Sequence, residues 1–477
     1  MTEETVFFVR IFMRKGVFVL CCAAAAFFAG CGSGSSNVVD GIYELTGIEN
    51  PYNTSGVMLQ GFSWESCKSS SWWNVIKSNA EEIGNDFEYV WFPPCSDSNS
   101  DQGYLPRKLY DFGAAYGTEK QLKSAITAIS PAKAIADVVI NHRCGTTSWG
   151  DFTNPSFGTV KGVNYKAICS DDEGFKREPA YMGKVSDSMR GAKDTGESYA
   201  AGRDLDHTNK DVQDGIIEFL GKLKDLGFCG WRYDFVKGYA GRYVGMYNKE
   251  TEPVFSVGEY WPTAGYSYLN PNDWGNDIKN WVAETASDGG QYSCAFDFAL
   301  KGAINTVFGN KSTNVANSRY NLLADESNLM ISNPEAAVTF VDNHDTGSTQ
   351  KHWYTDPADV GAAYVLILTH PGTPCVAWQH YFGEVSDSVC NETVPGTTQT
   401  LHDHIKYLID LRKTLGITNT SARETLSKTS SLYAAKITGS AGEAVVSFGN
   451  TTYSCPDGFL PTYSGTGWCI YVKDSVE

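Results

Sequence analysis

Short apolar runs recur along most of this chain, and several of them end in polar residues. Unbroken apolar runs of this kind are typical of strands buried on both faces of a parallel sheet. Eight strand candidates, several of them such runs, alternate with helical stretches, at residues 57–60, 89–92, 134–141, 230–234, 254–259, 295–298, 337–342 and 373–378. Eight strand-helix units predict an α/β fold with a closed (β/α)8 TIM barrel.

Helix signals lie between these runs. Residues 209–226 have Asp211 and Asp214 near their start, and Gly227 lies just past their end. Acidic residues early and glycine at the end are typical of a helix. Residues 403–415 are a second helix candidate of this kind.

Two segments depart from this alternation. Residues 143–206 are rich in Gly, Asp and Ser and follow the third strand, and so long an irregular insertion usually carries function. After the last helix, alternating runs at 431–437, 443–448 and 467–472 predict antiparallel strands. The expected organisation is a barrel in two parts, 56–142 and 207–418, with an inserted domain at 143–206 and a small C-terminal β domain at 419–477.

The N-terminus has the pattern of an export signal. A basic start at 13–15 is followed by an apolar stretch too short to span a bilayer comfortably, and by small residues before Cys31. Residues 28–31 read FAGC and resemble the bacterial lipoprotein box, with Phe in place of the usual Leu. We expect a signal peptide at 1–30, a lipidated Cys31 that binds the membrane, and a Gly- and Ser-rich tether at 31–55. The alternative is an ordinary signal peptide and a secreted, extracellular product.

Charge and cysteine content narrow the function classes. The 477-residue chain has a formal net charge of -17, which repels phosphate and argues against nucleic acid as a partner. Among its 13 cysteines, Cys455 and Cys469 are candidates for a disulfide, with the connectivity left open. No CxxC repeat or His cluster indicates zinc.

Four of the predicted strands end in carboxylates and histidines. The segments are DVVINH at 137–142, GWRYDFVKG at 230–238, VGEYW at 257–261 and VTFVDNHDT at 338–346. A parallel barrel has its active site at the C-terminal ends of its strands, so polar residues there predict chemistry. Arg232 points to the same face of its strand as Asp234, and its positive charge is expected to keep that carboxylate ionised.

These four motifs, in this order, resemble those of the alpha-amylases of glycoside hydrolase family thirteen. The chain is most similar to the plant and bacterial branch, because MLQGFSWES at 58–66, the segment at 103–118 and LTHPGTPC at 368–375 also match it. Four ordered motifs with such flanks are highly specific. The resemblance covers nearly the whole chain after the signal region.

Glycosidic cleavage requires a proton donor and a partner for the positive charge that grows on the sugar, hence two carboxylates in different environments. The resemblance implies that Asp234 is the nucleophile, that Glu259 is the acid and base, and that Asp345 favours the distorted sugar. It also implies that the substrate is bound by Tyr104, His142, Arg232, Lys237, Trp261 and His344. Taken singly, Asp234 is equally compatible with helix capping, Tyr104 and Trp261 with packing, and Lys237 with a solvated charge.

The resemblance also implies a structural calcium ion. Calcium takes six to eight oxygen ligands, typically carboxylates, carbonyls and water. The implied ligands are the side chains of Asn141, Asp194 and Asp204 with the carbonyls of Glu197 and Gly238, and Asp206 is an alternative to Asp204. No organic cofactor is expected.

The sequence therefore favours an endo-acting alpha-amylase that hydrolyses α-1,4 bonds of starch, glycogen or maltooligosaccharides with retention of configuration. We expect the protein to be exported, to act as a monomer and to be anchored to the membrane through Cys31. One alternative is transglycosylation or another α-glucan reaction on the same scaffold. A second is a starch-binding surface protein without catalysis, which is disfavoured because Asp234, Glu259 and Asp345 are all present.

Overall fold

The computed structural model describes residues 50–147, 150–158, 164–177, 183–308, 319–384, 389–449 and 453–474. The expected signal peptide, Cys31 and the tether as far as residue 49 lie outside these ranges. Within them, no helix is both long and apolar enough to cross a membrane.

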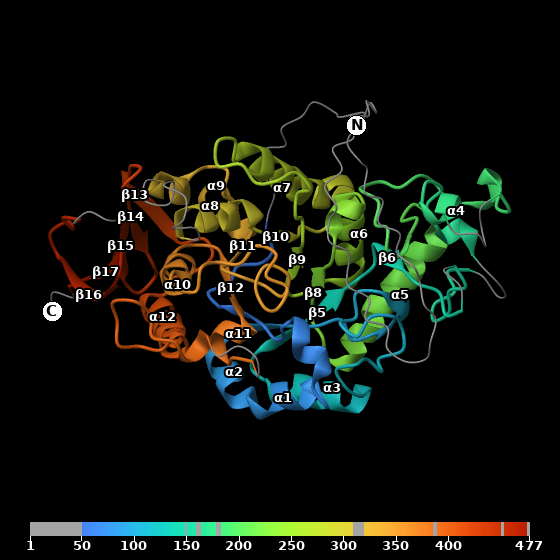
Figure 1. The fold of residues 1–477 in the computed structure, drawn as a ribbon, viewed down its shortest axis with the longest axis horizontal. Helices are drawn as coiled ribbons and strands as arrows, with labels where there is room; N and C mark the ends of the chain where they lie inside the picture. The colour runs from blue at the N-terminus through green and yellow to red at the C-terminus, as the bar shows by residue number, and fades with distance from the viewer. Residues whose placement is uncertain are drawn as a thin grey trace, which may run out of the picture. The chain divides into compact units, whose positions relative to one another are not determined.

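Eight parallel strands close into a barrel (Figure 1). Each overlaps the apolar run predicted for it, which confirms the barrel. In their order around the barrel, the strands are β1 (Met58–Gln60), β2 (Tyr89–Phe92), β5 (Lys133–Val138), β8 (Gly230–Tyr233), β9 (Ser256–Gly258), β10 (Cys294–Phe296), β11 (Ala337–Phe340) and β12 (Thr373–Ala377), which pairs with β1.

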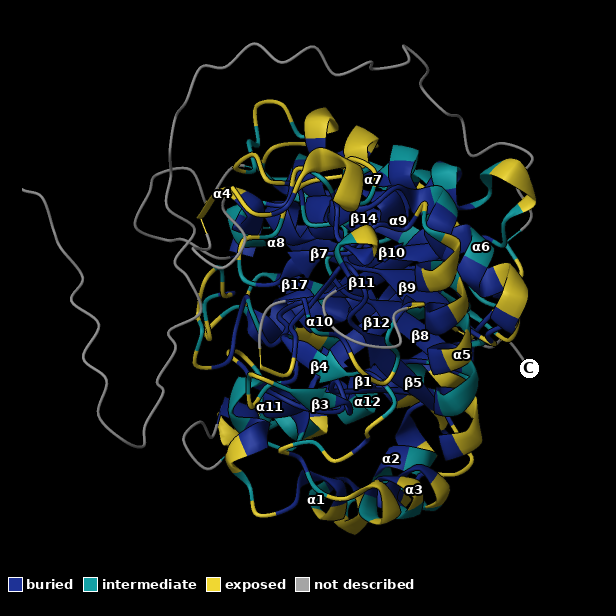
Figure 2. Ribbon diagram, turned by 90° about the vertical axis from the view of Figure 1, so that its right-hand side faces the viewer, coloured by how far each residue is buried: buried dark blue, intermediate teal, exposed yellow. Residues whose placement is uncertain are grey.

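Helices surround the barrel and cover its apolar strands. Figure 2 shows buried strands at the centre and exposed residues on the outer faces of the helices. The longer helices are α1 (Trp72–Ser78), α2 (Ala80–Asp86), α3 (Glu119–Ala128), α5 (Lys210–Leu226), α6 (Gly241–Thr251), α7 (Asn272–Thr285), α8 (Phe298–Phe308), α10 (Val360–Thr369) and α12 (Leu401–Leu415). Three helices of one turn are α4 (Gly174–Arg177), α9 (Leu329–Ser332) and α11 (Trp378–Tyr381).

The two helices expected from the sequence are present, with bounds set by their caps. In α5 the Asn209 side chain accepts a hydrogen bond from the amide of Asp211. The helix ends at Gly227, whose φ of 108° is readily adopted only by glycine. Helix α12 begins at Leu401, two residues before the predicted start, because the Thr400 side chain caps it.

Short ribbons follow the second and third barrel strands. The first pairs β3 (Asp97–Ser98) with β4 (Pro106–Lys108). The second pairs β6 (His142–Arg143) with β7 (Arg203–Asp204) in antiparallel register, so that His142 lies opposite Asp204. This second ribbon joins the two ends of the predicted insertion at the rim of the barrel.

The C-terminal segment forms one antiparallel sheet of five strands. Their order is β13 (Ala422–Lys428), β14 (Leu432–Thr438), β15 (Glu443–Gly449), β17 (Trp468–Lys473) and β16 (Phe459–Gly465). The two edge strands were not predicted, because β13 is mostly polar and β16 contains Pro461 at a break in its pairing. The thiols of Cys455 and Cys469 are free, so the disulfide considered from the sequence is not formed in this structure.

Candidate active site

A buried arginine lies at the centre of the polar residues at the strand ends. Arg232, on β8, is 0% exposed. Its Nη1 donates to Oδ1 of Asp137 at 2.9 Å and to Oδ1 of Asp234 at 2.8 Å. Its Nη2 lies 2.7 Å from Oε1 of Glu259, in an orientation that makes the contact an ion pair rather than an aligned hydrogen bond. One guanidinium thus faces three carboxylates from three adjacent strands.

The first of these carboxylates is held by the protein on both oxygens. Oδ2 of Asp137 accepts from the indole of Trp91 at 3.0 Å and from the hydroxyl of Tyr104 at 2.9 Å, and Oδ1 accepts from Arg232. The Trp91 ring also lies 4.7 Å from the guanidinium. Asp137 therefore acts as a fixed counter-charge and orients both Arg232 and Tyr104.

The other two carboxylates have raised pKa values, for the same main reason. Burial raises the pKa of Asp234 to about 7, and the hydrogen-bonded Arg232 opposes this rise. Burial raises the pKa of Glu259 to about 8, Arg232 opposes it, and the negative charges of Asp234 and Asp345 add to it. Both carboxyl groups therefore keep their protons to higher pH than exposed carboxyl groups do.

Glu259 is fixed by a strained turn after β8. Its Oε2 accepts from the backbone amide of Phe235 at 3.3 Å. Phe235 has φ 45° and ψ 47°, a left-handed conformation that is uncommon for a bulky residue and recurs at functional sites. The turn directs the amide that follows Asp234 toward Glu259, so the same backbone positions both carboxylates.

Asp345 lies on the loop after β11 with 25% of its side chain exposed. Its Oδ2 is 3.3 Å from Nε2 of His344, and its Oδ1 accepts from the amide of Gln350 at 3.2 Å. A buried ion pair at the base of this loop joins Lys301 and Asp342 at 2.7 Å. These contacts hold Asp345 close enough to Asp234 and Glu259 to raise the pKa of both.

Three nearly parallel rings lie beside these carboxylates. The rings of Tyr104 and His344 are 5.2 Å apart with planes 6° apart, and Trp64 lies 6.2 Å from each. Gln60 Nε2 lies 2.8 Å from Nδ1 of His344, which assigns the ring proton to Nε2 on the side of Asp345. Burial lowers the pKa of His344 to about 4, so the ring is a neutral donor.

The second predicted histidine is also neutral. Burial lowers the pKa of His142 to about 4. Its Nε2 is 2.8 Å from the carbonyl of Tyr104, and its Nδ1 is 3.2 Å from the amide nitrogen of Asn141. Tyr199, from the insertion, stacks on the ring at 3.8 Å and contacts Phe235 at 5.0 Å. His142 thus connects the insertion to the residues around Asp234.

Trp261 and Lys237 lie on the loops after β9 and β8. The Trp261 ring stacks on Phe298 at 5.0 Å and on Trp353 at 6.3 Å. The Lys237 ammonium donates to the hydroxyl of Thr263 at 2.6 Å. Contacts within the protein therefore hold the Trp261 and Lys237 side chains at the rim. By contrast, Asp137, Asp234, Glu259 and Tyr104 contact Arg232.

The predicted metal ligands form a separate group at the base of the insertion. Oδ1 of Asn141 and Oδ2 of Asp194 are buried and have no hydrogen-bond partner among the described residues. A Cβ at Gly238 would lie 2.1 Å from Oδ1 of Asn141. Burial raises the pKa of Asp204 to about 8, with further contributions from Asp194 and Asp172. Unpaired oxygens among mutually repelling carboxylates fit a hard cation.

Three other acidic residues lie near the predicted ligands: Asp172, Glu173 and the alternative ligand Asp206. Carboxylate oxygens of Asp172, Glu173 and Asp204 lie within 4.8 Å of one another, but Arg203 forms ion pairs with both Asp172 and Glu173. Asp206 accepts from the amide of Ala192 through Oδ2 and from that of Thr208 through Oδ1. Both oxygens of Asp204 also accept, from the backbone amide of Tyr199 at 3.2 Å. Asp204 fits a cation better than Asp206 because the negative charges of Asp194 and Asp172 act on it.

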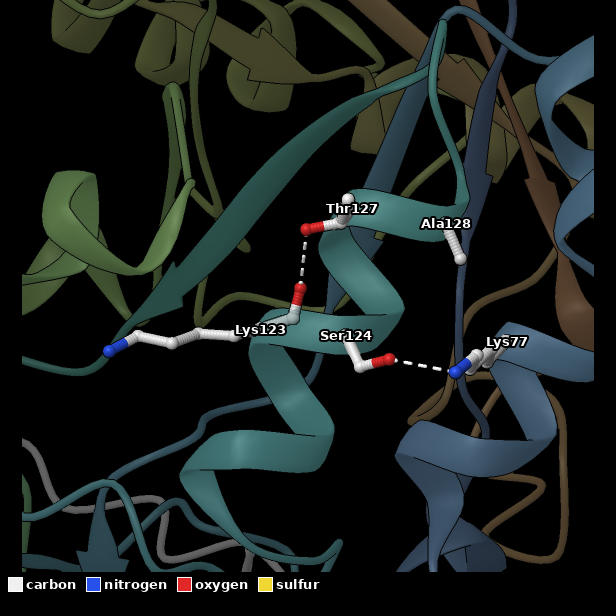
Figure 3. A pocket seen from close by; sticks show the side chains of 5 residues that line it. All are labelled: Lys77, Lys123, Ser124, Thr127 and Ala128. Carbon is white, nitrogen blue, oxygen red and sulfur yellow. Dashed lines mark hydrogen bonds between the residues drawn. The ribbon is translucent and has the colours of Figure 1, made fainter.

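A shallow groove of about 400 Å³ lies between α1 and α3 (Figure 3). Its lining contains two lysines and no carboxylate or aromatic ring, and the Lys77 ammonium donates to the hydroxyl of Ser124 at 2.9 Å. The groove therefore has none of the groups gathered around Arg232.

The residues at the site that were not predicted individually include Trp64, Asp137, Tyr199 and the backbone of Phe235. Trp64 lies within the segment at 58–66, and Phe235 follows Asp234 directly, so proximity to a motif was the only signal for either. Tyr199 reaches His142 because the insertion folds back over the barrel rim, and its local sequence carries no sign of this.

Comparison with known proteins agrees with this arrangement. The model of the alpha amylase catalytic domain matches residues 81–385. The chain is 34% identical over 412 residues to probable alpha-amylase 2 of Arabidopsis thaliana, covering 84% of this chain and 90% of that protein. It is 33% identical to the chloroplastic alpha-amylase 3 of the same plant, over 74% of this chain and 39% of that longer protein.

A bacterial relative and a solved structure extend the comparison. The glucan 1,4-alpha-maltotetraohydrolase of Roseateles saccharophilus is 29% identical over 77% of this chain and 63% of its own length. The structure of the Geobacillus thermoleovorans alpha-amylase complexed with acarbose has the same fold, with a TM-score of 0.61 at 15% identity over 89% of this chain and 99% of that one. With its family model and its plant relatives agreeing, the chain belongs to the alpha-amylase family and is a glycoside hydrolase.

Proposed function

We propose that this glycoside hydrolase cleaves internal α-1,4 bonds of starch, glycogen or maltooligosaccharides with retention of configuration. The observation that carries the proposal is the pair Asp234 and Glu259, which share one guanidinium but differ in their contacts. Asp234 accepts an aligned hydrogen bond from Arg232, whereas Glu259 accepts from the backbone amide of Phe235. Two carboxylates in different environments are what this reaction requires. Relatives named alpha-amylase and glucan 1,4-alpha-maltotetraohydrolase support the α-1,4-glucan as substrate.

In the proposed mechanism Asp234 attacks the anomeric carbon as a carboxylate, while Glu259 transfers its proton to the glycosidic oxygen. The C–O bond to the leaving sugar breaks, and a covalent glycosyl ester forms on Asp234. Glu259, now ionised, then takes a proton from water, whose oxygen attacks the same carbon and releases Asp234. The hydrogen bond from Arg232 to Oδ1 of Asp234 favours the ionised nucleophile at the start and stabilises it as the leaving group at the end.

The neighbouring groups have proposed roles in binding the cleaved sugar. Asp345 accepts sugar hydroxyls and stabilises positive charge at the anomeric centre. His142 and His344 are neutral, so their rings can border the sugar without opposing that charge. Tyr104 offers the face of its ring, and the hydrogen bond to Asp137 fixes its orientation.

A calcium ion is proposed at the base of the insertion, held by side chains of Asn141, Asp194 and Asp204 and by carbonyls of Glu197 and Gly238. The unpaired oxygens of Asn141 and Asp194 support this assignment. When bound, the ion supplies positive charge that joins the insertion to the barrel, and its role is structural. No step of the cleavage involves it.

Export and lipid anchoring through Cys31 are proposed from the N-terminal sequence, with the tether separating the anchor from the barrel. Replacing Cys31 with alanine should move the protein from the membrane fraction to the soluble fraction or block its processing. Membrane partitioning that is the same for Cys31→Ala and the wild type would contradict the anchor.

The assignment of nucleophile and acid is tested by Asp234→Asn and Glu259→Gln. Each should lower kcat by about 10⁴-fold or more, because each removes an essential group of one mechanism. Both variants should melt no lower than the wild type at pH 8. The pKa values of Asp234 and Glu259 are higher in the folded protein than in an unfolded chain, so their ionisation lowers the free energy of unfolding as pH rises toward 8. Asn and Gln do not ionise, so the variants are not destabilised in this way.

Proton NMR of the first-formed products checks retention at the same time. New reducing ends should appear first as the α anomer and then mutarotate. First appearance as the β anomer would overturn the retaining mechanism, and near-normal turnover of folded Asp234→Asn would overturn the role of Asp234.

The pH profile tests the order in which the two carboxylates lose their protons. With a short maltooligosaccharide, kcat/KM should fall about tenfold per pH unit above about 8, as Glu259 loses its proton, and below about 7, as Asp234 gains one. Asp345→Asn should move the acidic and alkaline limbs of this profile to lower pH, because the negative charge of Asp345 raises the pKa values of Asp234 and Glu259. Limbs that do not move in this variant would show that Asp345 does not act on the pair.

The calcium proposal is tested by the melting temperature with chelator and with added calcium. An ion bound only by the folded state adds about 2.7 kcal/mol at a concentration of 100 Kd. Chelation should lower the melting temperature, calcium should restore it, and Asp194→Asn should abolish the response. Asp206→Asn is the matched control, since Asp206 accepts backbone amides and its variant should still respond. A chelated wild type that melts like the calcium-loaded protein would disprove the site.

A further inference from the structure

The short segment 195–197 of the insertion is docked on the loop that follows Asp234. The amide of Glu197 donates to the carbonyl of Lys237 at 2.9 Å. The hydroxyl of Thr195 accepts from the amide of Ala240 at 3.0 Å. Two backbone-directed hydrogen bonds on either side of Gly196 fix the position of this segment.

Gly196 allows the two backbones to approach closely. A Cβ at this position would lie 2.4 Å from the carbonyl oxygen of Lys237 and 2.4 Å from the carbonyl carbon of Gly238. Contacts this short are not tolerated, so any larger residue would separate the segment from the loop. The Glu197 side chain therefore leaves the backbone from a fixed point beside Lys237.

Glu197, Lys237 and Thr263 form a group that we call the rim triad. The Thr263 hydroxyl donates to Oε2 of Glu197 at 2.5 Å and accepts from the Lys237 ammonium at 2.6 Å. The ammonium also lies 3.5 Å from Oε2 of Glu197. An ammonium and a carboxylate thus bind one aliphatic hydroxyl from two sides, and a sugar hydroxyl can be bound in the same way.

The rim triad comes from the loops that carry the two catalytic carboxylates. Lys237 lies three residues after Asp234, and its ammonium is 5.1 Å from the ring centre of Phe235, whose amide holds Glu259. Thr263 lies four residues after Glu259. Since Glu259 protonates the departing oxygen in the proposed mechanism, the loops that directly follow Asp234 and Glu259 are the ones expected to border the departing sugar.

The exposure of the rim triad leaves room for a ligand. The Glu197 side chain is 49% exposed and that of Lys237 is 14% exposed. Both contacts of the carboxylate are made by Oε2. A half-exposed ion pair contributes little to folding stability, so loss of Glu197 should leave the fold intact.

We propose that Glu197 is a specificity-determining residue that binds a hydroxyl of the glucose unit on the leaving side of the cleaved bond, together with Lys237. The inference rests on the proposed function and extends it, because it assigns a side chain of the insertion to the recognition of the departing part of the glucan. The sugar hydroxyl takes the position between carboxylate and ammonium that Thr263 now occupies, or bridges the same two groups beside it.

The test compares two substrates that present different groups on the leaving side. Maltoheptaose presents glucose units there, whereas 2-chloro-4-nitrophenyl maltotrioside presents an aryl group when the nitrophenol is released. Glu197→Ala should lower kcat/KM for maltoheptaose about tenfold, as expected for a lost hydrogen bond to a charged group. Release of the nitrophenol should change less than twofold. Glu197→Gln should lie between wild type and alanine on maltoheptaose.

A matched control and the ion response separate this role from a structural one. Glu119→Ala removes a carboxylate from an exposed ion pair on α3, with Lys123 at 2.7 Å, and should leave both substrates unaffected. The calcium-dependent melting shift of Glu197→Ala should equal that of the wild type, since a backbone carbonyl survives the substitution. Equal losses on both substrates, no loss on either, or a reduced calcium response would each overturn the proposal. A wild type that cleaves neither substrate would instead refute the proposed function.

Discussion

The buried guanidinium of Arg232 is the interaction on which the site depends. A charge with no exposure to water is stable only when it is paired, and here three carboxylates surround it. Asp137 is fixed by Trp91 and Tyr104, so it serves as the permanent partner. One positive charge cannot balance three negative ones in this environment. Burial is the main reason why the pKa values of Asp234 and Glu259 are raised, and the excess of negative charge adds to it.

The same constraint connects the fold to the chemistry. Parallel strands bring Asp137, Asp234 and Glu259 to one rim, because β5, β8 and β9 are neighbours in the barrel. The left-handed turn at Phe235 then directs a backbone amide to Glu259. Contacts of Tyr199 with His142 and Phe235 extend this rigidity to the insertion. Atoms that react are thus held by residues that take no part in the reaction.

The sequence predicted the features that have a local signal. Strands such as β2 and β10 are continuous apolar runs, and Asp234 and Glu259 directly follow the fully buried strands β8 and β9. The edge strands β13 and β16 lack such a pattern, since most of their residues are not buried and pairing with the sheet defines them. Trp64 and Tyr199 depend on loop paths that no short pattern encodes. The choice of Asp204 over Asp206 depends on the β6–β7 register and on the negative charges of Asp194 and Asp172 beside Asp204, which are not its neighbours in the sequence.

The β6–β7 ribbon has a consequence for how the insertion can vary. By pairing His142 with Asp204, it brings the two ends of the insertion together at the barrel rim. The chain between these ends is then a closed loop, and each doubling of such a loop costs only about 0.6 kcal/mol of closure entropy. The segment can therefore lengthen or shorten through evolution at little thermodynamic cost, while the spacing of the barrel strands on either side stays the same.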